Sequence, residues 1–212
     1  MNTIERDDEG LLTKIEAEIE WRRTRRRIYA SFWESRSKAV KERGIVCDFL
    51  KAVEIKNGSL WIKAVKANPH DPPDCVGTTF SGRFVAFEVT ELVDKTAIEQ
   101  NKATVRFWKE WPCPEFIGRL QAILSKKDQT QLERIYEANI LIIHTDEPLL
   151  RPSECAEMLH QHTFKPCREL TKAYLLFSYC PGEQGYPYLP LHFLRESRGR
   201  KSAPNCSLAV AR

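Results

Sequence analysis

The chain has 212 residues, a formal net charge of +4, 42% hydrophobic residues and 29% charged residues. This length predicts one domain with a buried core, and the composition is ordinary for a globular protein rather than a disordered one. Seven cysteines without a CxxC pair argue against a disulfide scaffold, and no apolar run reaches the ~18 residues that span a bilayer. Because the first ten residues are also unlike a secretory signal, we expect a cytoplasmic protein with no membrane partner.

The first predicted element is a long N-terminal helix over residues 11–43, which is expected to end at Gly44. At about 100° per residue its apolar side chains share one face. Arg22 and Arg26 fall on that same face, which predicts either a bend or a polar cleft that binds nucleic acid. The basic run 21–27 as a whole fits a phosphate-binding surface or a solvated helix flank paired with nearby glutamates.

Three strands are predicted next, over residues 59–67, 75–80 and 83–92. The first follows the turn signal Asn57-Gly58, and the other two flank Ser81-Gly82, a connection suited to a tight hairpin. The third strand is rich in apolar residues and is expected to run through the middle of a sheet.

The rest of the chain predicts further helices and strands. Residues 94–108 favour a helix, although 105–111 also fit an edge strand, and Pro114 opens a clearer helix. A short helix (129–136), a buried strand (139–144), a helix (153–162) and two strands (173–179 and 186–193) are expected in turn. We therefore predict a single domain over residues 1–194, with its core at 59–145, followed by a basic, disordered tail at 195–212.

Two carboxylates stand out in the segment that contains the three strands. Asp74 ends the sequence Asp-Pro-Pro-Asp at the start of the second strand, and Glu88 lies within the apolar third strand. Because side chains alternate along a strand, Glu88 and Thr90 share one face and Val89 lies on the other. An ionisable group in an apolar strand is costly unless it is paired or coordinated.

The order helix, three strands, helix, strand, with Asp74 opening the second strand and Glu88 in the third, resembles the PD-(D/E)xK nuclease superfamily over about residues 11–145. The resemblance implies an α/β, restriction-endonuclease-like fold: a mixed β-sheet flanked by helices. It implies that Asp74, Glu88 and the backbone carbonyl of Val89 bind Mg²⁺ or Mn²⁺. Such a metal neutralises charge and activates water for phosphodiester hydrolysis.

The chain departs from the superfamily pattern at Thr90, where a lysine is expected. That lysine positions the nucleophilic water or stabilises the developing charge. Either Lys95 or Lys102 supplies the missing charge, or Arg22 does, or the site is weak or inactive. The superfamily often places a glutamate on its first helix, and Glu18, at the edge of the apolar face, is the candidate here.

Other interpretations of these residues stay open. Pro-Pro-Asp is a common turn sequence, so Asp74 could cap a bend while Glu88 forms a buried salt bridge. Cysteines and histidines between 155 and 167 are zinc-ligand types, but helical spacing makes them diverge. The sequence therefore predicts a metal-dependent nuclease acting on DNA or RNA, and a homodimer is one assembly it allows. The alternative is an inactive nuclease-like fold that binds nucleic acid or protein.

Overall fold

A computed structural model describes residues 37–102, 109–132, 135–178 and 186–195. Within these ranges the chain forms a mixed α/β fold. The predictions for residues 11–36, which include Glu18, Arg22 and Arg26, lie outside the described residues, as does the predicted tail beyond Arg195. The long N-terminal helix is therefore not confirmed, although its last six residues belong to the helix described below.

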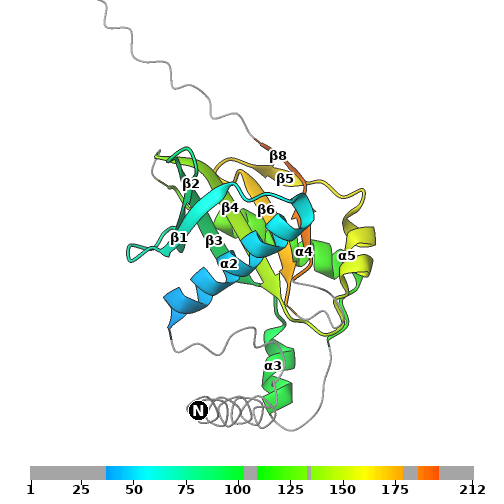
Figure 1. Cartoon of the computed structure of the whole chain (residues 1–212). Coiled ribbons are helices and arrows are strands. Elements are labelled where there is room, and N and C mark those ends of the chain that lie inside the picture. Colours follow the sequence, from blue (N-terminus) through cyan, green and yellow to red (C-terminus); the bar gives the residue numbers. More distant parts are fainter. Residues whose placement is uncertain (1–36, 103–108, 133–134, 179–185, 196–212) are drawn as a thin grey trace, which may run out of the picture.

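Six of the described strands form one mixed sheet (Figure 1) in the order β1-β2-β3-β4-β6-β7. Strands β1, β2 and β3 are antiparallel, β3, β4 and β6 are parallel, and β7 returns antiparallel to β6. Two short strands, β5 and β8, pair separately and in parallel. The bounds are β1 Ile62–Ala67, β2 Cys75–Thr79, β3 Phe84–Glu91, β4 Tyr136–Thr145, β5 Phe164–Cys167, β6 Lys172–Phe177, β7 Tyr188–Leu191 and β8 Phe193–Arg195.

Helices cover the two faces of the sheet, as the ribbon in Figure 1 shows. One face packs on α2 (Lys38–Asn57), and the other packs on α4 (Cys113–Lys127) and α5 (Pro152–Leu159), while α3 (Lys95–Lys102) follows β3. The alternation along β4 divides the core between the two faces. Ile140 and Ile142 join the α2 side, whereas Leu141 and Ile143 join the α4 side.

The described part of the first helix extends further than its sequence predicted. Instead of ending at Gly44, α2 continues to Asn57 and ends at Gly58, whose φ of 70° suits a glycine. A glycine inside a helix costs about 1 kcal/mol. Burial of several side chains beyond it, Phe49 and Val53 among them, against the sheet gains about 1.5–3 kcal/mol each and outweighs that cost.

The three predicted strands after the first helix are present as β1, β2 and β3, each slightly shorter than expected. The helix predicted for 94–108 is present as α3 over its first part, and residues 103–108 lie outside the described ranges. The short helix predicted for 129–136 is wrong in the residues that are described. Gln129 lies in a turn and Tyr136 already begins β4, because Tyr136 pairs with Phe84 of β3.

The end of the described chain also differs from its prediction. The single strand expected over 186–193 is two strands, because the chain leaves the main sheet at His192. The carbonyl of His192 accepts a hydrogen bond from the Phe164 N–H at 2.8 Å, which aligns β8 with β5. None of the helices in the described ranges is long and apolar enough to cross a membrane.

Candidate carboxylate and lysine site

The two predicted carboxylates meet at the sheet edge where β2 begins. The register Cys75↔Phe87 and Val76↔Ala86 puts Asp74 opposite Glu88 at the next step, with both side chains on the α4 face. Both are buried, with exposed fractions of 5% for Asp74 and 2% for Glu88. The sheet therefore brings together two acids that lie in neighbouring antiparallel strands.

Backbone groups fix the position of Asp74. The Val89 N–H donates to Asp74 Oδ2 at 2.8 Å, and the carbonyl of Asp74 accepts from the Asn68 N–H at 3.0 Å. The second bond closes the loop that carries the two prolines, of which Pro73 is buried. A carboxylate held by backbone donors loses little further freedom when it binds a cation.

A lysine reaches both acids from α4 instead of from β3. Lys127, the last residue of α4, has its Nζ 2.6 Å from Glu88 Oε2 and 3.9 Å from Asp74 Oδ2. Thr90, on the same face as Glu88, supplies no charge. The sequence held a signal for Lys127, because Leu120, Leu124 and Lys127 follow an i, i+4, i+7 spacing and so share the apolar face of the helix.

Helix α2 contributes a second lysine and a third acid. Lys38 Nζ lies 2.8 Å from Asp71 Oδ2, 3.4 Å from Glu42 Oε1 and 3.5 Å from Asp74 Oδ1. The side chain of Glu42 is only 12% exposed. Glu42 is thus the glutamate of the described first helix that approaches Asp74, and the predicted Glu18 lies outside the described residues.

The crowding of acids changes their proton affinities. Burial, followed by the negative charge of Asp74, raises the pKa of Glu42 to about 7. Burial also raises the pKa of Glu88, although the ammonium of Lys127 opposes this change. Acids whose pKa is raised in this way have too little compensating positive charge around them, which favours a cation at the site.

The residues present fit a magnesium ion better than a zinc ion. Glu88 Oε1 is buried and has no hydrogen-bond partner, so one carboxylate oxygen is available to a ligand. Mg²⁺ keeps several waters and needs only one or two carboxylates from the protein. In the described ranges no group of three or more histidines, cysteines or acids is placed to hold any metal ion, so an ion here would depend on the two carboxylates and on waters.

The lysines predicted to replace the missing charge lie on α3. Lys95 is exposed at the start of that helix and lines a hollow of 500 Å³ with Trp111 and Glu115. No ion pair among the described residues joins Lys95 to Asp74 or Glu88. Lys102 belongs to α3, but its side chain lies outside the described part. The observed lysine contacts of the two acids therefore come from Lys38 and Lys127.

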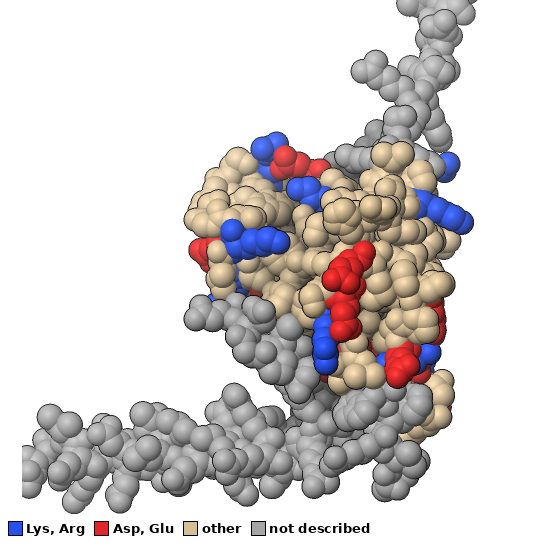
Figure 2. Space-filling view, turned by 90° about the vertical axis from the view of Figure 1, so that its right-hand side faces the viewer, with Lys and Arg blue, Asp and Glu red and all other residues tan. Residues whose placement is uncertain are grey.

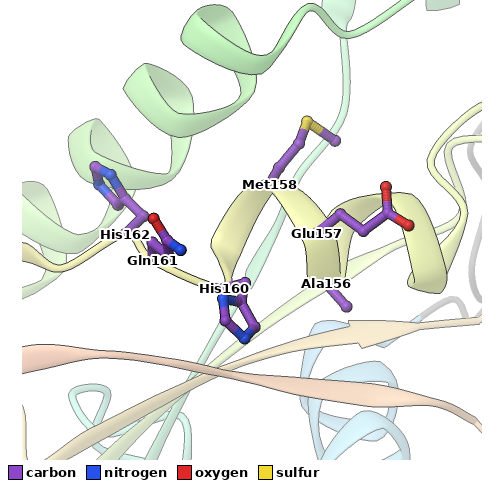
Figure 3. A pocket seen from close by; sticks show the side chains of 6 residues that line it. All are labelled: Ala156, Glu157, Met158, His160, Gln161 and His162. Atoms are coloured by element: carbon purple, nitrogen blue, oxygen red, sulfur yellow. The ribbon is translucent and has the colours of Figure 1, made fainter.

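The histidines after α5 do not converge on a metal site. Figure 3 shows His160 and His162 beside a hollow of 590 Å³, with their rings on different sides of the chain. The ring of His162 packs on Phe164, with centroids 4.5 Å apart. The divergence itself agrees with the prediction, but its reason differs, because α5 ends at Leu159 and both histidines follow the helix instead of lying on it.

Comparison of the chain with protein-family models, with curated proteins and with solved structures finds no match in any of the three. The function therefore has to be argued from the geometry of Asp74, Glu88 and the residues around them.

Proposed function

We propose that the protein is a metal-dependent nuclease that hydrolyses phosphodiester bonds of DNA or RNA at the site formed by Asp74, Glu88 and Lys127. One observation carries the proposal. Two buried acids on adjacent strands share the ammonium group of Lys127, while Glu88 Oε1 keeps no partner. Two acids can hold a metal ion that activates water, and a lysine beside them can stabilise the charge that develops on the phosphate.

Asp74 and Glu88 would hold a Mg²⁺ or Mn²⁺ ion, with the carbonyl of Val89 and waters as further oxygen ligands. When bound, the ion neutralises phosphate charge and lowers the pKa of its water. The Val89 N–H keeps Asp74 in place. Lys127 contributes a positive charge beside both acids, where it can stabilise the charge that develops on the phosphate.

The order of elements also supports a restriction-endonuclease-like core. The chain runs α2, β1, β2, β3, α4, β4 with α3 inserted after β3, and the two acids stand at the start of β2 and within β3. A lysine from α4 would replace the one that the superfamily places two residues after the glutamate. Lys127 would thus supply the positive charge that is missing at Thr90.

A second candidate is a nuclease-like fold without activity that serves as a binding module. The close Lys127–Glu88 ion pair favours it, because that pair already compensates much of the buried charge. In this case the two acids and the lysine stabilise the fold and bind no metal.

The direct test is cleavage of labelled single- and double-stranded DNA and RNA with Mg²⁺, with Mn²⁺ and with a chelator. The nuclease proposal predicts metal-dependent products that disappear in Asp74→Asn and Glu88→Gln. Glu157→Gln, which changes an exposed acid on α5, is the matched control and should cut like the wild type. If wild-type protein that binds nucleic acid cuts none of these substrates with either metal, the binding module is correct.

A further inference from the structure

Exposed aromatic side chains gather at one end of the main sheet. In the described part of the chain, three phenylalanine or tryptophan side chains are strongly exposed: Trp61 (39%), Phe80 (69%) and Phe84 (44%). Trp61 directly precedes β1, Phe80 lies in the turn that joins β2 to β3, and Phe84 begins β3. The register Ile62↔Thr79 brings Trp61 to the same end as Phe80.

This end of the sheet is joined to the carboxylate and lysine site by strand β3. Phe84 and Glu88 are four residues apart on β3, so their side chains share the α4 face. At about 3.3 Å per residue they are separated by roughly 13 Å, a span of a few nucleotides. A strand of nucleic acid on Phe84 would therefore lie within a few nucleotides of the site, although Ala86 between the two positions and Glu88 itself are buried.

No helix in the described ranges packs on the α4 face of β1 and β2. The core on that side contains residues of α4, β4 and β6 but none from β1 or β2. Val76 and Thr78 are half-buried there, while Ala64 and Lys66 are exposed. The other face of these strands is covered, because Ile62 and Cys75 pack with α2. We call the open face, together with the three exposed aromatic residues, the hairpin shelf.

The charges beside the hairpin shelf suit a polyanion. Lys63 and Lys66 on β1 and Arg83 beside the hairpin turn are exposed. Among the described residues, the acid that pairs with them is Glu137, which is bound by Arg83 Nη1 at 2.6 Å. By contrast, the side of the molecule nearest α5 (Figure 2) shows acidic and basic side chains together, with neither sign dominating.

We propose that the hairpin shelf binds single-stranded nucleic acid, so that bases stack on Phe80, Phe84 and Trp61 while phosphates contact the nearby lysines. This inference rests on the proposed function, since it names the substrate of the same site. Exposed aromatic rings next to basic residues are typical of surfaces that bind single strands. Paired bases in a duplex are already stacked and do not offer their faces to such rings.

The test measures binding of fluorescein-labelled dT12 and of the dA12·dT12 duplex to the full-length protein by anisotropy, with a chelator present to prevent cleavage. We expect the single strand to bind at least tenfold more tightly than the duplex. Phe84→Ala and Phe80→Ala should each weaken binding of dT12 by at least about fivefold, the lower range for the loss of one stacked base.

Three further variants separate stacking from other effects. Phe84→Tyr should keep the affinity, and Phe84→Leu, which stays apolar but cannot stack, should lose it. Leu149→Ala removes a side chain of 39% exposure outside the shelf and should bind like the wild type. Thermal melts of all variants, including Phe80→Ala, confirm that each is folded.

The outcomes distinguish this inference from the proposed function. If the wild type cuts nucleic acid but binds duplex as well as single strands, or if Phe84→Ala has no effect, the shelf inference is overturned and the nuclease stands. If the wild type cuts nothing yet binds dT12 through Phe84, the nuclease fails and the stacking surface stands. A change in oligomeric state in Phe84→Leu, without any binding of dT12, would make the shelf a protein interface and overturn the inference.

Discussion

Two clusters of buried polar residues lie close together, one in the second half of β3 and the other just beyond its end, but their acids find partners in different ways. At the end of β3, Thr145 Oγ1 donates to the Leu92 carbonyl and accepts from the Glu147 N–H, and Glu147 Oε1 accepts from the Asp94 N–H. At the carboxylate and lysine site, by contrast, Glu88 meets a lysine and keeps one oxygen without a partner.

The comparison shows that burial of an acid does not by itself indicate function. In the cluster around Thr145 the polar atoms complete the backbone hydrogen bonds of strand ends and a helix start, so they stabilise the fold. Around Asp74 the acids face one another and two lysines, and the pKa values of Glu42 and Glu88 are raised. The second arrangement costs stability and is therefore the better candidate for a binding site.

The largest expected effect comes from removing the ammonium group of the site. Lys127→Met should lower the rate of metal-dependent hydrolysis by about 10²–10³, the usual cost of losing one group that stabilises developing charge. Lys126→Met changes the exposed neighbouring lysine and should leave the rate unchanged. Gel-based cleavage rates measure both variants.

A second change in the same background sharpens this prediction. Thr90→Lys puts a lysine on the face of Glu88, where the superfamily carries one. Added to Lys127→Met, it should restore part of the lost rate. An unchanged rate in Lys127→Met alone would show that this lysine has no part in the chemistry.

A substitution in the cluster around Thr145 should lower the stability of the fold without changing metal binding at the carboxylate and lysine site. Thr145→Val keeps the shape of the side chain but removes its hydrogen bonds with the Leu92 carbonyl and the Glu147 N–H. We expect the free energy of unfolding to fall by about 2–4 kcal/mol, measured by urea denaturation. Affinity for Mn²⁺ should stay at the wild-type value, and a weakened affinity would contradict the separation of the two clusters.

The raised pKa of Glu42 makes stability depend on pH. Glu42 titrates at about 7 in the folded state against an ordinary value of 4.5, so its contribution is fully present below pH 4.5 and lost as the pH rises through 7. Across this pH window the unfolding free energy of the Glu42→Gln variant should therefore change less than that of the wild type, by on the order of 1–2 kcal/mol. Urea denaturation at a series of pH values checks this, and an identical slope in both proteins would contradict it.

The smallest expected effect concerns Asn139, the residue of β4 opposite Ala86. Both polar atoms of its side chain are buried without a partner. Because Asn139→Leu removes two unpaired polar atoms, we expect it to be neutral or to raise the unfolding free energy by up to about 1 kcal/mol. A loss of several kcal/mol in thermal denaturation would show that the amide has an essential partner.

Sequence reasoning located the two acids because their positions depend on local rules. Strand alternation and the Ser81-Gly82 turn signal are enough to bring Asp74 and Glu88 to one face. The predicted end of the first helix at Gly44 is wrong. Burial of the following apolar turns against the sheet outweighs the low helix propensity of a single glycine. The predicted helix at 129–136 failed for a similar reason, as pairing with β3 extends β4 back to Tyr136.

The lysine was missed because long-range packing decides which charge reaches a buried acid. Lys127 is 39 residues from Glu88 in the sequence, whereas the predicted sources of charge were Lys95 and Lys102, soon after Thr90, and Arg22 on the first helix. A charged residue on the apolar face of a helix indicates more directly which charge reaches a buried acid. Lys127 extends the stripe of Leu120 and Leu124, and Glu42 precedes Ile45 and Val46 by one turn on α2.

The central claim, that Asp74 and Glu88 bind a divalent cation, is tested most directly by calorimetric titration of the protein with Mn²⁺ near pH 8, where Glu42 is ionised. We expect one saturable site in the wild type that disappears in Asp74→Asn and in Glu88→Gln but persists in Glu157→Gln. A wild-type protein that shows no heat of binding, or a site that survives both substitutions, would contradict it.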